Sequence, residues 1–237
     1  MPRMNRPDMS SSHFDEIALA YDSSLPGHVV EHYLRKRADY LARLCPSGAA
    51  LDVGCGTGAL ASLLSARGYQ VVGVDPSAGM LDVMRSRAPA VQAIQAPGSS
   101  LPFEDDQFDL VVSVATFHHI AAPDEVRRTL GQMVRVCRPN GHVVVWDHNP
   151  RNPYWGNLMA RVPQDTGDER LIGAAEIVAG LTQSRAQVLR VEQLGLVPDF
   201  TPRAALPLAV AAERLFEKAP LLNRYAAHNV VVARPQP

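Results

Sequence analysis

The sequence contains few cysteines and no arrangement of them that suggests a bridge or a metal site. Only Cys45, Cys55 and Cys137 occur among 237 residues. An odd number without metal-ligand spacing argues against a disulfide framework and predicts no bound metal. We therefore expect a reduced, cytoplasmic protein whose thiols are small buried apolar groups.

Long apolar runs and an excess of one charge are also missing. No stretch approaches the roughly 18 apolar residues of a membrane span, and the polar residues 1–12 lack the apolar core of a signal peptide. The 23 basic and 24 acidic residues give a formal net charge of −1, so composition points to neither nucleic acid nor an anionic membrane. With 46% hydrophobic residues, the chain can form one large domain, or a core with a lid.

Apolar runs and helical patterns alternate through the middle of the chain. Several of the runs are nearly continuous, as expected where helices cover both faces of a parallel sheet. The pattern predicts an α/β, doubly wound, mostly parallel sheet of seven strands, counting two late ones. Strands are predicted at 49–53, 70–74, 91–95, 108–115, 141–147, 187–194 and 227–233, and helices at 14–21, 29–44, 59–67, 77–87, 124–137, 174–184 and 203–218.

Two stretches interrupt this alternation. Residues 149–173 are rich in proline, asparagine and aspartate, and residues 199–220 lie between the late strands. We interpret both as additions over the ligand-binding end of the sheet, which would form a lid, and not as a second domain. Residues 1–44 are expected to form an N-terminal helical cap on a core of residues 45–237.

A glycine loop is the most informative motif. Residues 51–58 read LDVGCGTG, so an apolar strand ends in an acid and three glycines follow at alternate positions. Gly54-x-Gly56-x-x-Ala59, with Asp75 further on, also satisfies the dinucleotide fingerprint. Asp52 argues against that reading, because a carboxylate near a pyrophosphate costs about 4 kcal/mol at 4 Å. The same carboxylate suits a ligand with an ammonium group, such as S-adenosylmethionine.

Taken together, the motifs resemble those of class I S-adenosylmethionine-dependent methyltransferases of the small-molecule type 11-like subgroup. Asp52-x-Gly54-x-Gly56-x-Gly58 is similar to the first motif of that family, and residues 74–77 to its second-strand motif. Residues 101–109, His118-His119 and residues 136–141 match later motifs in the same order. The resemblance covers about residues 45–147 and implies a Rossmann-like fold.

The resemblance implies a role for particular residues in holding the cofactor. Asp52 would serve the amino group of the cofactor, and the glycine loop would allow its close approach. Asp75 would accept both ribose hydroxyls, for which a carboxylate is suited, although an acid there could instead cap the next helix. Pro76 and Met80 would pack against adenine. Further contacts are implied for Tyr21, Cys55, Gly98, Ser99 and Val114.

One position departs from the family pattern. Relatives commonly carry an acid that accepts a hydrogen bond from the adenine amino group, and Pro97 occupies that place here. Proline offers neither a side-chain acceptor nor a backbone N–H. Gly98 or Ser99 would then have to supply a backbone contact, and cofactor affinity would suffer before chemistry does.

Three histidines are candidates for catalysis. His118 and His119 follow the fourth predicted strand and His148 follows the fifth, where ligands of doubly wound sheets bind. An imidazole suits proton removal from an acceptor near neutral pH, although a structural role for each remains open. His228 is expected to be structural.

The added segments offer further candidates. Four aromatic residues would either form an apolar lid or pack the added helices, and four arginines would either bind an anionic acceptor or remain solvated. The aromatic residues are Tyr154, Trp155, Phe200 and Phe216, and the arginines are Arg35, Arg37, Arg151 and Arg161.

The leading interpretation is an S-adenosylmethionine-dependent methyltransferase that moves a methyl group to an oxygen, nitrogen or carbon of a small molecule. We expect the acceptor to be a secondary metabolite and the product of the cofactor to be S-adenosylhomocysteine. An NAD-binding oxidoreductase is the first alternative, and a non-catalytic protein of the same fold is the second. Nucleic acid is disfavoured as a partner by the nearly neutral charge.

Overall fold

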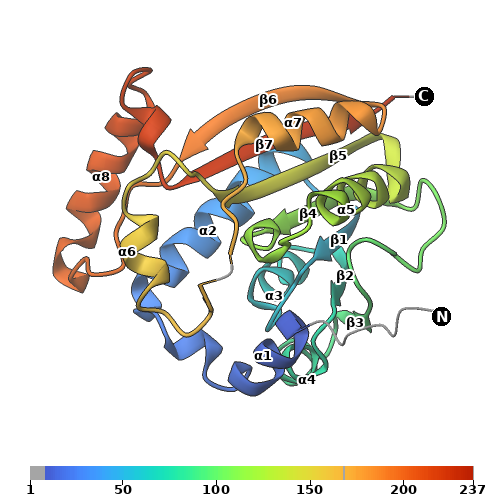
Figure 1. The fold of residues 1–237 in the computed structure, drawn as a ribbon, viewed down its shortest axis with the longest axis horizontal. Coiled ribbons are helices and arrows are strands. Elements are labelled where there is room, and N and C mark those ends of the chain that lie inside the picture. The colour runs from blue at the N-terminus through green and yellow to red at the C-terminus, as the bar shows by residue number, and fades with distance from the viewer. Residues whose placement is uncertain (1–8, 168, 237) are drawn as a thin grey trace.

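A twisted sheet of seven strands forms the centre of the protein, as seen in a computed structural model that describes residues 9–167 and 169–236 (Figure 1). The strand order is β3-β2-β1-β4-β5-β7-β6, with β7 antiparallel to both of its neighbours and the other pairs parallel. The predicted doubly wound, mostly parallel sheet is confirmed. The strands are β1 (Ala49–Val53), β2 (Gln70–Asp75), β3 (Gln92–Gln95), β4 (Phe108–Val114), β5 (Cys137–His148), β6 (Ala186–Leu194) and β7 (His228–Pro235).

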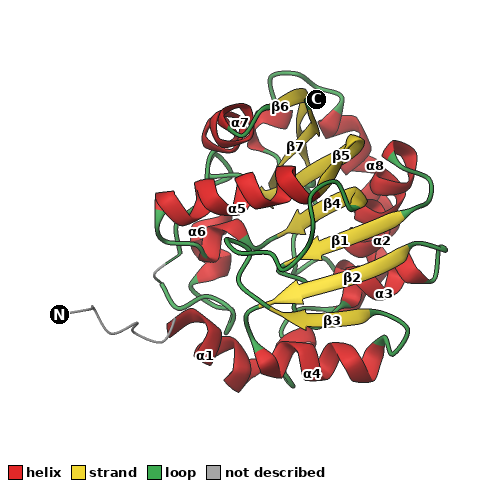
Figure 2. Ribbon diagram, turned by 90° about the vertical axis from the view of Figure 1, so that its right-hand side faces the viewer, coloured by secondary structure: helices red, strands yellow, loops and turns green. Residues whose placement is uncertain are grey.

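Helices cover both faces of the sheet, with α2 and α3 on one side and α5 and α7 on the other (Figure 2). Successive residues of the central strands enter different apolar clusters: Val143 packs with α5 and α7, and Val144 packs with α2 and α3. The α-helices are α1 (Met9–Ile17), α2 (Gly27–Leu44), α3 (Ala59–Ser65), α4 (Ala78–Arg87), α5 (Pro123–Val136), α6 (Trp155–Met159), α7 (Ala174–Gln183) and α8 (Leu206–Glu217), and the 3-10 turns are η1 (Tyr21–Ser23), η2 (Phe117–His119), η3 (Arg203–Ala205) and η4 (Asn223–Tyr225).

Most predicted boundaries lie within two residues of the observed ones, and the exceptions have tertiary causes. Helix α1 begins and ends earlier than the predicted 14–21, and it docks on α4 through Asp15, which accepts hydrogen bonds from the Ser77 hydroxyl (2.6 Å) and the Gly79 N–H (2.8 Å). Strand β5 begins at Cys137 and not at residue 141, because Cys137 pairs with Phe108 before the register shifts. Helix α6 within residues 149–173 was not predicted.

The carboxyl ends of the central strands define the ligand-binding end. Strands β1 and β4 are neighbours, but the helices that follow them, α3 and α5, cover opposite faces, and ligands of doubly wound sheets bind at such a reversal. Helices α6 and α8, from the two added segments, lie beyond this end at the left of Figure 1. Over the described ranges, no helix combines the length and apolarity that crossing a membrane requires.

Candidate active site

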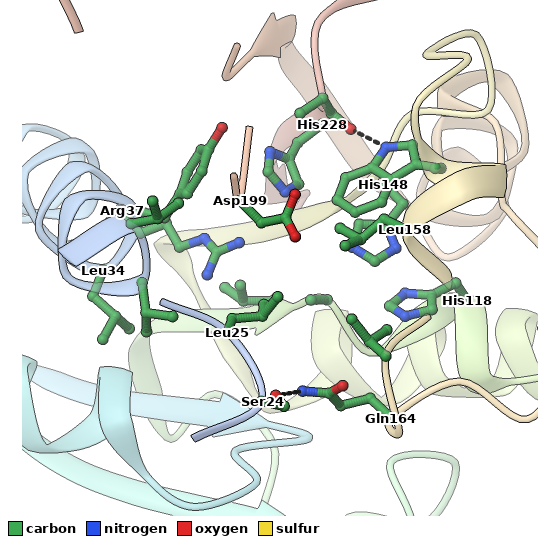
Figure 3. Close-up of a pocket in the computed structure, with 18 of the residues that line it drawn as sticks. Ser24, Leu25, Leu34, Arg37, His118, His148, Leu158, Gln164, Asp199 and His228 are labelled. Atoms are coloured by element: carbon green, nitrogen blue, oxygen red, sulfur yellow. Dashed lines mark hydrogen bonds between the residues drawn. The ribbon is translucent and has the colours of Figure 1, made fainter. Parts of the chain in front are cut away.

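Two adjoining cavities occupy the ligand-binding end. Cavity I, about 590 Å³, lies between α2, the α6 segment and the loop after β6 (Figure 3), and cavity II, about 630 Å³, lies between the end of β2, α1 and α5. A shared wall separates them and includes the glycine loop and the turn after β4. The residues common to both cavities are Tyr21, Gly54, Gly56, Ala115, His119 and Gln164.

The three glycines of the loop have different tasks. All have positive φ angles, which L side chains rarely adopt. A Cβ on Gly54 would lie 2.3 Å from the Thr116 side chain, and one on Gly58 would lie 2.4 Å from Met84, so both positions are required by packing. A Cβ on Gly56 would meet nothing within 4 Å. The open approach expected of the whole motif is therefore provided at Gly56.

Asp75 ends β2 on the floor of cavity II, beside Pro76 and Met80. Its Oδ2 accepts the Gly56 N–H and its Oδ1 accepts the Ser77 N–H, both at 2.9 Å. Burial raises the pKa of Asp75, and these two bonds oppose the rise. Helix α4 is capped by the Ser77 side chain, which accepts the Met80 N–H, so Asp75 is not the helix cap. Each of its oxygens keeps a lone pair for a ligand.

Asp52 and Arg37 bring opposite charges into cavity I without pairing. Asp52 is 2% exposed, and within the described residues no hydrogen bond reaches its carboxylate. Burial raises its pKa to about 7; Asp75 adds to the rise and Arg37 counters it. The Arg37 guanidinium enters the same cavity from α2 (Figure 3). Among the residues that the structure describes, it has neither an ion pair nor a hydrogen bond. Two unpaired, opposite charges in one cavity suit a ligand with both an ammonium and a carboxylate.

The other three arginine candidates do not share this arrangement. Arg35 pairs with Glu31 at 2.5 Å on the surface of α2, and Arg151 is exposed. Arg161 donates a hydrogen bond to the Tyr154 hydroxyl at 3.0 Å. Arg37 is therefore the one of the four that can meet a ligand inside cavity I.

The rings of the three predicted catalytic histidines follow one another in a column, tilted by 44° and 33° between neighbours. Ring centroids are separated by 4.0 Å between His119 and His118, 4.0 Å between His118 and His148, and 3.6 Å between His148 and Trp155. All four residues line cavity I. His228, expected to be structural, also lines it and lies 5.8 Å from His148.

Asp147, at the end of β5, fixes His118 in this column. Its Oδ1 lies 2.8 Å from His118 Nδ1 and accepts the His148 N–H, and its Oδ2 accepts the N–H groups of Thr116 and Phe117. Burial would raise the pKa of Asp147, but His118 and these N–H groups outweigh it and lower the pKa. The other ring nitrogen, Nε2, faces Asp165 Oδ1 at 4.0 Å, beyond hydrogen-bond distance.

The histidines differ in protonation. Burial lowers the pKa of His119 and of His228 to about 3, and that of His148 well below its usual value, so these three are neutral at pH 7. Burial also acts on His118, but the Asp147 carboxylate more than offsets it and raises the pKa. Of the four, His118 is the one whose pKa its surroundings raise.

Aromatic side chains from both added segments form the outer wall of cavity I. Tyr154, Trp155, Phe200 and Phe216 all line it. The Trp155 indole donates to the Ala227 carbonyl at 2.6 Å, and the rings of Tyr154 and Phe200 lie 5.9 Å apart. The wall is thus anchored at Trp155.

Cavity II contains polar groups that sequence reasoning missed. Pro97 and Gly98 line it, whereas Ser99 is not a lining residue and donates its hydroxyl to Glu125 at 3.4 Å. Glu125 and Thr129, both on α5, face the same space, and the Thr129 hydroxyl is buried without a partner in the described chain. No local motif marks these two residues.

The remaining implied contacts are also distributed over the two cavities. Tyr21 lies in the shared wall, and burial raises its pKa to about 12. Cys55 and Val114 line cavity I. Burial raises the pKa of the Cys55 thiol, so it is a packing group and not a nucleophile.

Comparison with known proteins defines the class. A family model described as a methyltransferase domain matches residues 51–145. The chain is 31% identical over 200 residues to the demethylmenaquinone methyltransferase of Paenarthrobacter aurescens, a match that covers 82% of this chain and 74% of the relative. It is also 31% identical over 167 residues to an uncharacterized methyltransferase of Mycobacterium tuberculosis, covering 69% of this chain but only 63% of that protein's length.

A solved structure shares the fold over nearly the whole chain. It is described as a S-adenosylmethionine-dependent methyltransferase, possible histamine N-methyltransferase, from Thermotoga maritima, and it superimposes with a TM-score of 0.70 at 17% identity, covering 96% of this chain and 100% of the other. The chain therefore belongs to the class I S-adenosylmethionine-dependent methyltransferases. Residues 51–145 of this chain match the methyltransferase domain of the family. Enzymes of this class use S-adenosylmethionine.

Proposed function

We propose that this protein transfers a methyl group from S-adenosylmethionine to a small molecule held in cavity I. The observation that carries the proposal is the unpaired couple of Asp52 and Arg37, which matches the ammonium and carboxylate of the methionyl tail. A dinucleotide pyrophosphate would meet the Asp52 carboxylate unfavourably.

The residues present fit the whole cofactor. Asp75 would accept the ribose hydroxyls, and the adenine would lie against Pro76 and Met80 in cavity II. The Thr129 hydroxyl or the Glu125 carboxylate would accept from the adenine amino group, in the role that Pro97 cannot fill. Bound there, the cofactor supplies an activated methyl group for in-line displacement.

Cavity I would hold the acceptor under the lid formed by residues 149–173 and 199–220. Its apolar walls would exclude water and orient the acceptor against the shared wall, which is the main requirement of such a displacement. The neutral form of His118 would receive the acceptor's proton at Nε2, while Asp147 holds the ring and stabilises the charge it gains. His119 and His148, both neutral, would position the acceptor.

The relatives support a small-molecule acceptor. Several are named demethylmenaquinone methyltransferases, and the apolar walls of cavity I suit an acceptor with a large apolar body. The chain spans less than two thirds of the mycobacterial relative's length. The proposed class of acceptor therefore rests on the walls of cavity I and not on that relative.

Calorimetric titration tests the proposal. We expect micromolar binding of S-adenosylhomocysteine and no comparable binding of NAD. Arg37→Gln should weaken the binding of S-adenosylhomocysteine at least tenfold, because a hydrogen bond to a charged group contributes about 1.5–3 kcal/mol. The same substitution should leave the binding of 5′-methylthioadenosine unchanged, because this ligand lacks the amino-acid tail. A preference for NAD, or equal losses for both adenosyl ligands, would overturn the assignment.

The raised pKa of Asp52 predicts that cofactor binding depends on pH. Below a pKa of about 7 this carboxyl is protonated and loses its attraction for an ammonium group, so affinity should increase as pH rises. Between pH 6 and pH 8 the ionised fraction changes about tenfold, and the affinity for S-adenosylhomocysteine should increase by up to that factor. Asp52→Asn should bind weakly at both pH values. A wild-type affinity that is flat over this range would contradict the role of Asp52.

A further inference from the structure

Helix α8 and the segment after it present large apolar side chains to solvent. Leu208 and Leu221 are each 75% exposed, Leu215 is 72% exposed and Leu222 is 55% exposed. Leu208 and Leu215 are seven residues apart and therefore lie on the same side of the helix. In Figure 1, α8 lies at the edge of the molecule, away from the sheet.

The inward face of α8 is held by charges. Glu213 is 1% exposed and contacts His32 Nε2 at 2.9 Å and Lys36 Nζ at 2.7 Å, both on α2. Glu217 also pairs with Lys36 and accepts the Gly195 N–H at 2.7 Å. Both acids of the helix are therefore used in docking, and the leucines remain outside.

The exposed charges of this region all have one sign. Among the exposed residues between 202 and 225, four are basic and none is acidic: Arg203, Arg214, Lys218 and Arg224. The formal net charge of −1 for the whole chain conceals this segregation. Exposed leucines and exposed basic side chains in one helical segment are typical of a helix that lies in the headgroup region of a membrane.

This surface continues into the wall of cavity I. Phe200 is 67% exposed and Tyr225 is 44% exposed, and both also line cavity I. A partner seated on α8 would therefore lie against the outer wall of that cavity.

We propose that the α8 surface, defined by Leu208, Leu215, Leu221 and Leu222 with the four basic residues above, docks on an anionic lipid bilayer. The leucines would enter the headgroup region and the basic side chains would contact lipid phosphates. A second copy of this chain fits less well, because a twofold contact through the same surface would bring like charges together. The docking does not depend on the methyl transfer proposed above.

Vesicle sedimentation tests the docking. Full-length protein should sediment with vesicles of phosphatidylcholine and phosphatidylglycerol (1:1) at low salt, but poorly with pure phosphatidylcholine or in 0.5 M NaCl. Arg214→Gln with Lys218→Gln should weaken binding by about 25-fold, fivefold for each basic residue. Leu215→Ser with Leu222→Ser should weaken it at least tenfold.

Matched variants elsewhere on the surface are the controls. Leu19→Ser, at a residue that is 95% exposed, and Arg85→Gln on α4 should bind vesicles as the wild type does. All variants should keep the wild-type melting temperature and S-adenosylhomocysteine affinity, which separates docking from the proposed function. The proposal is overturned if wild-type protein does not bind anionic vesicles, or if the control variants lose as much vesicle binding as the α8 variants. It is also overturned if the protein binds no vesicles and light scattering shows a dimer that Leu215→Ser dissociates.

Discussion

Replacing Asp147 with alanine should lower the free energy of unfolding by about 3–5 kcal/mol, the range for removing one partner of a buried charge pair. The carboxylate accepts three backbone N–H groups and the His118 ring at a fully buried position. Without it, these buried donors at the ends of β4 and β5 lose their acceptor. Urea denaturation measures the change.

The control for this prediction is Asp82→Ala, which removes an exposed acid whose partner is Arg85 and should cost less than about 1 kcal/mol. The pH dependence supplies a second check. The folded protein lowers the pKa of Asp147, so its stabilisation is present above the unfolded value of about 3.9 and disappears as pH falls through the folded value. The difference between wild type and Asp147→Ala should therefore shrink in acid. A loss below 1 kcal/mol at pH 7 would show that Asp147 does not organise the site.

Asp75→Ala should weaken S-adenosylhomocysteine binding by about 2–3 kcal/mol, or roughly 30- to 150-fold, because two hydroxyl bonds to a charged acceptor are lost. Calorimetric titration of the folded variant measures the effect. Asp75 also holds Gly56 and Ser77, so part of a loss could reflect a displaced loop.

A neighbouring acid separates these two causes. Asp15 contacts the same start of α4 through Ser77 and Gly79 but does not line cavity II. Asp15→Ala should therefore loosen α4 while changing the affinity less than about threefold. Equal losses for both variants, or unchanged affinity for Asp75→Ala, would remove the ribose role from Asp75.

Local patterns in the sequence were sufficient for the sheet and for the glycine loop at its ligand-binding end. Strand periodicity located β1 and β2 closely. The rule that ligands bind beyond parallel strands pointed to His118, His119 and His148, which all line cavity I. The glycine motif indicated a close approach of backbone and ligand. It could not indicate that Gly56 faces open space while Gly54 and Gly58 face side chains, because that depends on Thr116 and Met84.

What escaped prediction depends on packing between distant segments. Arg37 appears in the sequence as one of several helix arginines, and only the docking of α2 brings it opposite Asp52. Thr129 and Glu125 face cavity II because of how α5 lies across the sheet. Likewise, the charges of α8 are sorted by contacts with α2, which no property of residues 206–217 alone reveals.

The wall shared by the two cavities has a thermodynamic consequence. Tyr21, His119 and Gln164 line both cavities, so a molecule in one cavity would contact side chains that a molecule in the other also contacts. Any cooperativity that results must be reciprocal. The factor by which the first ligand changes the affinity for the second equals the factor by which the second changes the affinity for the first. Binding of a ligand in cavity I and binding of a ligand in cavity II are therefore linked equilibria.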